Sequence, residues 1–83
     1  MYTVYILFSQ KLNKFYVGST LNLEQRLFQH NHGKTPFTKT GIPWIHIFSI
    51  SVENRSQAIL LETKIKKRGI ERYLKDINNL TIK

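Results

Sequence analysis

The chain has 83 residues, and its 13 lysines and arginines against 5 aspartates and glutamates give a formal net charge of +8. This length suits a single domain over residues 1–83, and the absence of cysteine excludes disulfides, thiolate metal sites and cysteine nucleophiles. The positive charge favours a polyanionic partner, most simply nucleic acid, with an anionic membrane surface as the alternative. No apolar run approaches the roughly 18 residues of a membrane span, and no signal-peptide pattern opens the chain, so we expect a cytoplasmic protein that does not enter a membrane.

The first elements predicted are two strands. Residues 2–8 are mostly β-branched and aromatic, which is typical of a strand. A polar connection at residues 9–14 leads to a second short strand at residues 15–19, so we expect an antiparallel hairpin.

A helix and a loop should follow the hairpin. Asn22 is a favourable cap for a helix over residues 23–31, where apolar residues recur at helical spacing. Gly33 is expected to end this helix. Residues 32–43 hold two glycines and two prolines, so they predict a loop, made basic by lysines.

The third strand is predicted at residues 44–52. Strict alternation would place five of its side chains on one face of the sheet: Trp44, His46, Phe48, Ile50 and Val52. Trp44 and Phe48 are expected in the core rather than as base-stacking residues.

Two further helices complete the chain. One is predicted from about Ser56 to Arg68, capped by Asn54 or Ser56 and ended by Gly69. Its expected buried stripe is Ala58, Leu61 and Ile65, with Glu62 on the flank. The other helix shows apolar residues at helical spacing, namely Ile70, Tyr73, Leu74 and Ile77.

The predicted order is β-β-α-β-α-α. A hairpin followed by a helix and one more strand favours an α+β fold, a small three-stranded, mainly antiparallel sheet flanked by helices, over a doubly wound α/β fold.

Several motifs in a fixed order resemble a known family. Tyr5 ends Thr-Val-Tyr, Tyr16 opens Tyr-Val-Gly, Arg26 follows ten positions later, His30 four after that, and Glu62 lies in a lysine-rich helix. The same order includes Ser19-Thr20, Phe37-Thr38-Lys39 before Pro43-Trp44, and Arg55-Ser56 before Glu62. Over about residues 2–75, this set resembles the GIY-YIG nuclease domain, in particular the short stand-alone branch related to the N-terminal domain of the bacterial excinuclease.

The resemblance implies a metal-dependent endonuclease that hydrolyses phosphodiester bonds in DNA, or RNA in its place, in DNA repair or on unusual DNA structures. Mg²⁺ or Mn²⁺ is the implied cofactor. The implied catalytic residues are Tyr5, Tyr16, Arg26, His30 and Glu62.

Three positions depart from the family pattern. Thr3 stands where the first motif has glycine, and Ser19 stands where many relatives have a lysine. Many relatives also carry an asparagine about a dozen residues after the glutamate, where this chain has Tyr73 and Leu74. The contributions of those groups are therefore absent here or supplied by other residues.

Glu62 is the expected metal ligand. Mg²⁺ keeps several waters and needs only one or two protein carboxylates, which suits a chain with few acidic residues. The simpler interpretation is a helix-surface residue that pairs with Lys66 at i, i+4.

Arg26 and His30 also stand at i, i+4, so their side chains should emerge on one helix face. Arginine can brace a phosphate, and histidine can relay a proton or hydrogen-bond a tyrosine hydroxyl. The alternative is a solvated helix face with a half-buried histidine.

Tyr5 and Tyr16 lie on paired strands, so both hydroxyls could reach one site. A phenol has a reference pKa near 10 and needs a nearby cation to act as a base at neutral pH. We favour Tyr16 as the base and Tyr5 as the orienting group; the alternative is two core or sheet-surface tyrosines.

Nucleic-acid contacts are expected from a set of basic and small residues: Gly18, Ser19, Lys34, Lys39, Lys64, Lys66, Lys67 and Arg68. Lysine and arginine contacts to phosphates give affinity without reading sequence. The bland alternatives are a bulge at Gly18, a turn cap at Ser19 and a solvated helix face for the cations.

Three functions compete at this point. They are a metal-dependent nuclease, a catalytically silent nucleic-acid-binding module of the same fold, and an adaptor for proteins or membrane surfaces, which charge alone favours. So small a surface is expected to select DNA by structure more than by sequence, acting as a monomer or a weak homodimer. His32 and His46 receive no role, and no zinc site is expected.

Overall fold

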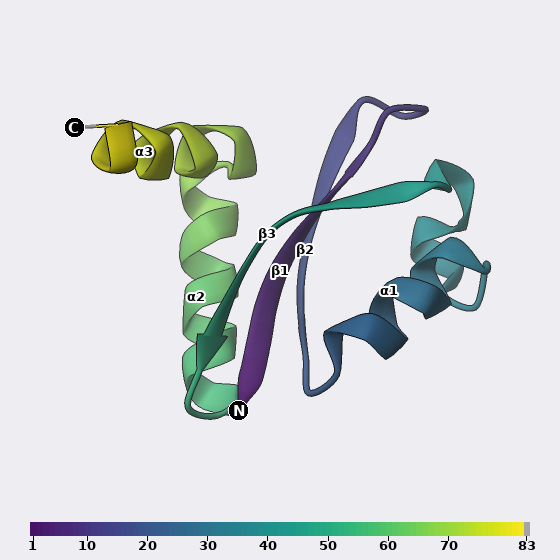
Figure 1. The fold of residues 1–83 in the computed structure, drawn as a ribbon, viewed down its shortest axis with the longest axis horizontal. Helices are drawn as coiled ribbons and strands as arrows, with labels where there is room; N and C mark the ends of the chain where they lie inside the picture. Colours follow the sequence, from purple (N-terminus) through teal and green to yellow (C-terminus); the bar gives the residue numbers. More distant parts are fainter. Residues whose placement is uncertain (83) are drawn as a thin grey trace.

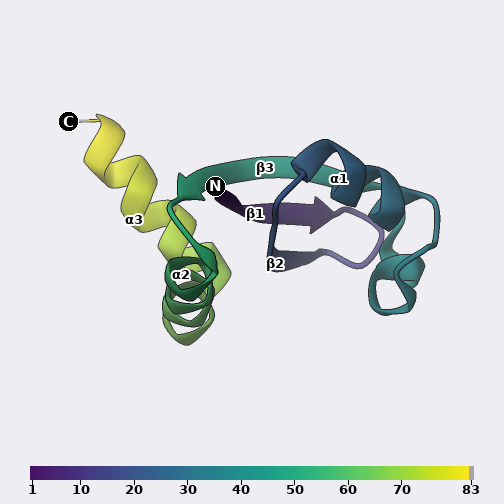
Figure 2. The same ribbon diagram turned by 90° about the horizontal axis from the view of Figure 1, so that it is seen from below.

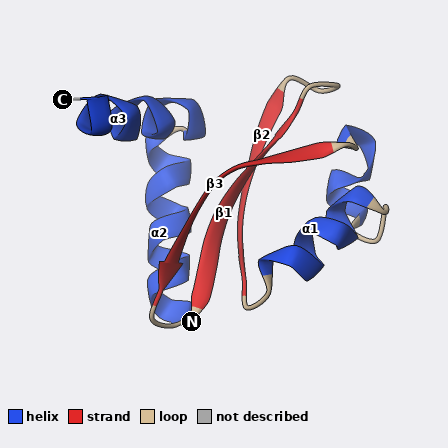
Figure 3. Cartoon of the chain, in the orientation of Figure 1, coloured by secondary structure: helices blue, strands red, loops and turns tan. Residues whose placement is uncertain are grey.

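A computed structural model describes residues 1–82, apart from the side chains of residues 37 and 79–82. The helices and strands follow the predicted order, β-β-α-β-α-α (Figures 1 and 3). The elements are β1 (Tyr2–Ser9), β2 (Lys14–Thr20), α1 (Leu23–Asn31), the 3₁₀ helix η1 (Pro36–Gly41), β3 (Trp44–Val52), α2 (Arg55–Arg68) and α3 (Ile70–Ile82). The α+β prediction is therefore confirmed.

The sheet is antiparallel and has the strand order β2-β1-β3. The predicted hairpin joins β1 to β2 through a turn in which Asn13 has a φ of 53°, a conformation that asparagine tolerates better than most residues. β1 lies in the middle, and its central residues from Val4 to Leu7 are all buried. Because alternate side chains of a strand point to opposite faces, β1 supplies both sides of the molecule.

A β-bulge in β3 corrects the prediction that its alternate residues share one face. Ile6 pairs with Phe48 but the next residue, Leu7, pairs with His46, so Ile47 is an extra residue in β3. The bulge moves Trp44 and His46 to the face of Leu7, while Phe48 and the residues after it keep the opposite face.

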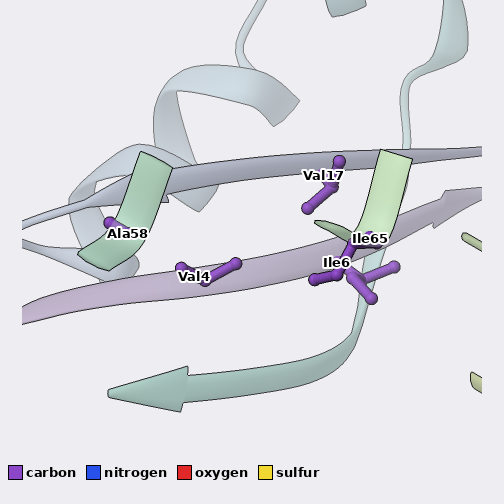
Figure 4. Packing of buried hydrophobic residues seen from close by; sticks show 5 residues of the cluster. All are labelled: Val4, Ile6, Val17, Ala58 and Ile65. Carbon is purple, nitrogen blue, oxygen red and sulfur yellow. The ribbon is translucent and has the colours of Figure 1, made fainter. Parts of the chain in front are cut away.

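One face of the sheet packs against α2 and α3. Its buried cluster contains only apolar side chains: Val4, Ile6, Val17, Ala58 and Ile65 (Figure 4). The predicted stripe of α2 is confirmed, with Leu61 partly buried at the edge of the cluster. Tyr73 and Leu74 of α3 pack against the same cluster, so the positions where many relatives carry an asparagine are used here for packing.

The opposite face packs against α1 and η1 (Figure 2). Tyr5, Leu7 and Trp44 form the buried cluster, and Leu23 and Leu27 of α1 cover it. Trp44 is thus a core residue, as expected.

The ends of the helices follow the local sequence. Asn22 accepts a hydrogen bond from the Gln25 amide at 3.1 Å, and Asn54 accepts one from the Gln57 amide at 2.9 Å, so both are N-caps. Gly69, with a φ of 93°, ends α2 and lets α3 leave in a new direction, as Figure 1 shows.

The predicted loop over residues 32–43 needs one correction. Its centre is the 3₁₀ helix η1, in which the Thr38 amide donates to the Thr35 carbonyl at 3.1 Å. Pro36 at the first position has its φ already set for a helical turn, which favours this conformation. No helix among residues 1–82 is long and apolar enough to cross a membrane.

Candidate active site

Tyr5 lies flat against β2 because Gly18 leaves room for it. The two residues pair directly across the strands, and a Cβ atom at Gly18 would lie 2.7 Å from the Tyr5 hydroxyl oxygen. Gly18 is itself buried, so neither a bulge nor an approaching substrate explains the glycine. Its role in this structure is to accept the aromatic ring of Tyr5.

A buried chain of hydrogen bonds continues from Tyr5 into α1 and η1. The Thr38 hydroxyl donates to the Thr35 carbonyl at 3.3 Å, so Thr38 Oγ1 accepts from the His30 Nδ1 hydrogen at 2.7 Å. His30 Nε2 is then the acceptor for the Tyr5 hydroxyl, at 2.9 Å. Tyr5, His30 and Thr38 are at most 2% exposed.

Burial keeps the members of this chain neutral. It raises the pKa of Tyr5 far above that of an ordinary phenol, helped by Tyr16 and Glu62 and opposed by Arg26. Burial also lowers the pKa of His30, and Arg26 acts in the same direction. Tyr5 therefore keeps its proton and does not serve as a base at neutral pH.

Trp44 and Asn31 hold η1 in place beneath this chain. The indole Nε1 of Trp44 donates to the Thr38 carbonyl at 2.7 Å. The Asn31 amide side chain binds both main-chain groups of Trp44, accepting from its N–H at 2.6 Å and donating to its carbonyl at 3.1 Å. The position of Thr38, and with it the orientation of His30, thus depends on β3 as well as α1.

Tyr16 stands between the buried chain and the surface. Its ring makes edge contacts with His30 and Trp44, at centroid distances of 5.2 and 6.1 Å, and is tilted at 6.3 Å from the ring of Tyr5. Tyr16 also lines an open cavity of about 420 Å³, which we call the Tyr16 cavity. Its lining residues are Phe15, Tyr16, Val17, Glu62, Lys66 and Ile70.

Glu62 reaches the Tyr16 cavity from α2. The Ser19 hydroxyl donates to Glu62 Oε2 at 2.6 Å, which joins the end of β2 to α2. The described side chains form no ion pair between Glu62 and Lys66, although both line the cavity. Ser19, the residue that replaces a lysine of many relatives, therefore orients this carboxylate.

The donor set suits a hard divalent cation with few protein ligands. In the part of the chain that the structure describes, no three histidine or acidic side chains gather as a metal-binding group. Glu62 is therefore a lone carboxylate that faces an open cavity, as Mg²⁺ or Mn²⁺ requires when waters and a phosphate oxygen complete the coordination.

Arg26 lies at a second, polar cavity of about 360 Å³, which we call the Arg55 cavity. It is lined by Tyr2, Ser19, Thr20, Leu21, Arg26 and Arg55. Ser19 belongs to this cavity and also bonds Glu62, so the two cavities adjoin across the end of β2.

The fold thus brings together the five residues named as catalytic from the sequence: Tyr5, Tyr16, Arg26, His30 and Glu62. Three of them line a cavity, whereas Tyr5 and His30 lie behind Tyr16 in the interior. Thr38, Asn31 and Trp44, which fix His30, and Arg55 were not identified as site residues from the sequence. The only signal for Thr38 and Arg55 was their place in the motif order.

The basic residues are spread over different surfaces. Lys64, Lys66 and Lys67 are exposed on α2, and only Lys66 lines the Tyr16 cavity. Arg68 forms a bidentate ion pair with Asp76 at 2.8 and 3.0 Å, so its charge is partly balanced. The exposed Lys34 and Lys39 flank α1 and lie outside both cavities, the Lys39 chain running over Gly33. His32 stacks on Phe28 at 3.8 Å.

Comparisons with known proteins agree with this geometry. Residues 1–76 match the family model of the GIY-YIG catalytic domain. A UPF0213 protein of Staphylococcus haemolyticus (strain JCSC1435) is 36% identical over 68 residues, covering 81% of this chain and 83% of its own length. A UPF0213 protein of Lactococcus lactis subsp. cremoris (strain SK11) is 37% identical over 70 residues, covering 82% and 71% respectively. No solved structure matches the chain. The protein therefore belongs to the GIY-YIG family, whose nuclease domain supports a nuclease-like function on nucleic acid.

Proposed function

We propose that the chain is an endonuclease that hydrolyses phosphodiester bonds in DNA with the help of one divalent metal ion, Mg²⁺ or Mn²⁺. The observation that carries this proposal is the Tyr16 cavity, where a phenol and a lone carboxylate face the same open space beside Lys66. Such a cavity gives a phosphate, a water molecule and a cation access to the same groups. DNA of unusual structure, as met in repair, is the favoured substrate because so small a surface cannot read a long sequence.

Glu62 is the proposed metal ligand. The Ser19 hydroxyl holds Oε2, and the other carboxylate oxygen has no hydrogen-bond partner among the described side chains. A bound Mg²⁺ or Mn²⁺ supplies charge stabilisation for the phosphorus centre and for the leaving oxygen.

Tyr16 is the proposed general base. In the reaction it takes a proton from a water molecule, whose oxygen forms a bond to phosphorus. The bond from phosphorus to the leaving oxygen breaks, and this oxygen departs with the electron pair and gains a proton from solvent. A phenol accepts this role near neutral pH only beside positive charge, which Arg26 and Lys66 provide from the two cavities.

Tyr5 and His30 are proposed to position Tyr16 rather than to touch the substrate. Both are buried, and both pack their rings against that of Tyr16. This arrangement revises the expectation that Tyr5 orients the attacking water directly. Arg26 is the proposed contact to the phosphate that is cut, where a guanidinium can bind two oxygens at once.

A cleavage assay tests the proposal. Supercoiled plasmid and branched or flapped oligonucleotides are incubated at low salt with Mg²⁺, with Mn²⁺, or with EDTA. We expect metal-dependent cutting that Glu62→Ala and Tyr16→Phe each reduce by at least about a hundredfold. Glu71→Ala removes an exposed carboxylate of α3 outside both cavities, and this matched control should cut as well as the wild type.

Two results would contradict the proposal. Cutting that survives both Glu62→Ala and Tyr16→Phe would indicate a contaminating nuclease or another site. Salt-sensitive DNA binding without any cutting by the wild type would instead identify a binding module of the same fold.

A further inference from the structure

The Arg55 cavity has the composition of an anion site. Two guanidinium groups and two hydroxyl side chains line it, and no acidic residue does. Among the described side chains, neither Arg26 nor Arg55 has a hydrogen-bond or ion-pair partner. Two unpaired cations that share one concave space repel each other, and an anion between them removes this repulsion.

The cavity is assembled from segments that are far apart in the sequence. Arg55 opens α2, Tyr2 opens β1, Thr20 ends β2 and Arg26 comes from α1. In Figure 1 the start of β1, the end of β2 and the start of α2 all lie at the bottom of the view. The folded sheet therefore creates this site, and no single segment contains it.

The two arginines face different neighbours. Arg26 acts on the pKa of both Tyr5 and His30, so its charge lies close to the catalytic groups. Arg55 has no such effect on either residue and lies farther out. The cavities adjoin at Ser19, which places Arg26 between the Tyr16 cavity and Arg55.

We propose that the Arg55 cavity binds a second backbone phosphate, the one next to the phosphate that is cut on the same strand. The inference rests on the proposed function, because it takes the cut phosphate to lie between Glu62, Tyr16 and Arg26. Arg55 then binds the neighbouring phosphate with help from the hydroxyls of Thr20 and Ser19. A polynucleotide repeats its phosphates along one strand, so two adjoining anion sites fix its register over the catalytic groups.

Metal-free binding measurements test this inference apart from cleavage. Fluorescence anisotropy of a labelled DNA oligonucleotide in EDTA is followed over a range of salt concentrations, with circular dichroism to check the fold of each variant. Arg55→Ala should weaken binding about tenfold and reduce the salt slope by about 0.9 on duplex DNA, the loss of one phosphate contact. Arg55→Lys keeps the charge without the planar fork and should fall between Arg55→Ala and the wild type.

A neutral phosphate analogue gives the sharper test. A set of oligonucleotides carries one methylphosphonate at successive positions around the cleavage site. One position should weaken wild-type binding about tenfold and have no further effect on Arg55→Ala, because the variant has already lost that contact. Lys11→Ala, which removes an exposed charge in the β1–β2 turn at the far end of the hairpin, should keep the wild-type response at every position.

The outcomes separate the inference from the proposed function. If the wild type binds DNA and Arg55→Ala behaves like Lys11→Ala, the Arg55 site is overturned and the nuclease proposal stands. If the analogue and Arg55→Ala act on one shared contact but no cutting occurs with metal, the site holds and the nuclease proposal fails. If the wild type does not bind DNA, both are overturned.

Discussion

The two faces of the sheet are built from the same strand but in different ways. Val4 and Ile6 of β1 point into a cluster that is entirely apolar, whereas Tyr5 and Leu7 point to the other face, which carries a chain of buried hydrogen bonds. The apolar face is closed by α2 and the polar face by α1 and η1. One residue step along β1 therefore separates side chains that hold the fold together from side chains that position the chemistry.

This difference carries a physical lesson. Apolar contacts stabilise in proportion to the area buried and tolerate small shifts, whereas a buried hydrogen-bond chain needs every partner in place. In such a chain each removed partner leaves another group unsatisfied, at a cost of about 1–3 kcal/mol. We therefore expect substitutions on the apolar face to change stability alone, and those on the polar face to change stability and cleavage together.

The largest effect is expected from the apolar face. Ile65→Ala should lower the free energy of unfolding by about 2–5 kcal/mol, because Ile65 is fully buried in the cluster with Val4 and Ile6. Urea unfolding measures this change. Ile59→Ala on the same helix is the matched control, since Ile59 is half exposed, and it should cost about 0.5 kcal/mol or less.

The milder Ile65→Val variant tests whether this face affects the chemistry. It should cost about 0.5–1.5 kcal/mol and leave a folded population large enough to assay. Its cleavage rate per folded molecule should equal that of the wild type. A rate loss beyond the folded fraction would show that the two faces are coupled, contrary to the comparison.

Gly18→Ala should have the next largest effect. The added methyl would meet Tyr5 Oη at 2.7 Å and Cζ at 2.9 Å, so the buried ring must shift and its hydrogen bond to His30 weakens. We expect a loss of about 1–3 kcal/mol, as for other overpacked sites, together with slower cleavage. Urea unfolding and the plasmid assay follow the two effects.

A double substitution checks the cause. Tyr5→Phe removes the hydroxyl that lies nearest to the added methyl, so Gly18→Ala should cost less in that background than in the wild type. Additive losses would mean that Gly18 is needed for its backbone conformation and not for the space it leaves to Tyr5.

Thr38→Val is expected to cost somewhat less, about 1–2 kcal/mol. The variant keeps the shape of the side chain but leaves the buried Nδ1 hydrogen of His30 without its acceptor. His30 then no longer holds Tyr5 in one orientation, so cleavage should slow beyond the loss of folded protein. Thr40→Val, at an exposed position of η1, serves as the control and should be nearly neutral in both assays.

Local signals in the sequence predict most of the fold. Asn22 and Asn54 cap helices where capping residues were expected, and Gly69 separates α2 from α3. These features depend on neighbours within a few positions, which is why a single sequence contains them. The bulge at Ile47 does not, since it arises from the pairing of β3 with β1, and the predicted face of β3 was wrong for that reason.

The site was predictable only in part for a related reason. The motif order named Tyr5 and Tyr16 together, but only the register of β1 and β2 puts Tyr5 over Gly18 and leaves Tyr16 at the cavity. Thr38 stands among other threonines in a short polar segment, and nothing in that segment distinguishes it. Its importance comes from His30 and Trp44, which reach it through the fold.

The smallest expected effect is a pH dependence that belongs to the polar face alone. Burial lowers the pKa of His30 from its ordinary value of 6.5, and the charge of Arg26 adds to this effect, while Tyr5 and Tyr16 beside it are phenols. The unfolded chain therefore binds a proton to His30 at a higher pH than the folded chain does. It follows that the stabilisation from neutral His30 is complete above pH 6.5 and decreases as the pH falls below this value towards the folded pKa.

Urea unfolding between about pH 7 and 5 measures this dependence. The wild type should lose stability steadily over this range, whereas His30→Gln should start less stable and change less. His32→Gln and His46→Gln are matched controls because both residues are exposed, and each should keep the wild-type slope. An equal slope in His30→Gln and the wild type would mean that His30 is protonated in the folded protein. In that case the Tyr5 hydroxyl would not donate to His30 Nε2, and the neutral chain on the polar face would have to be redrawn.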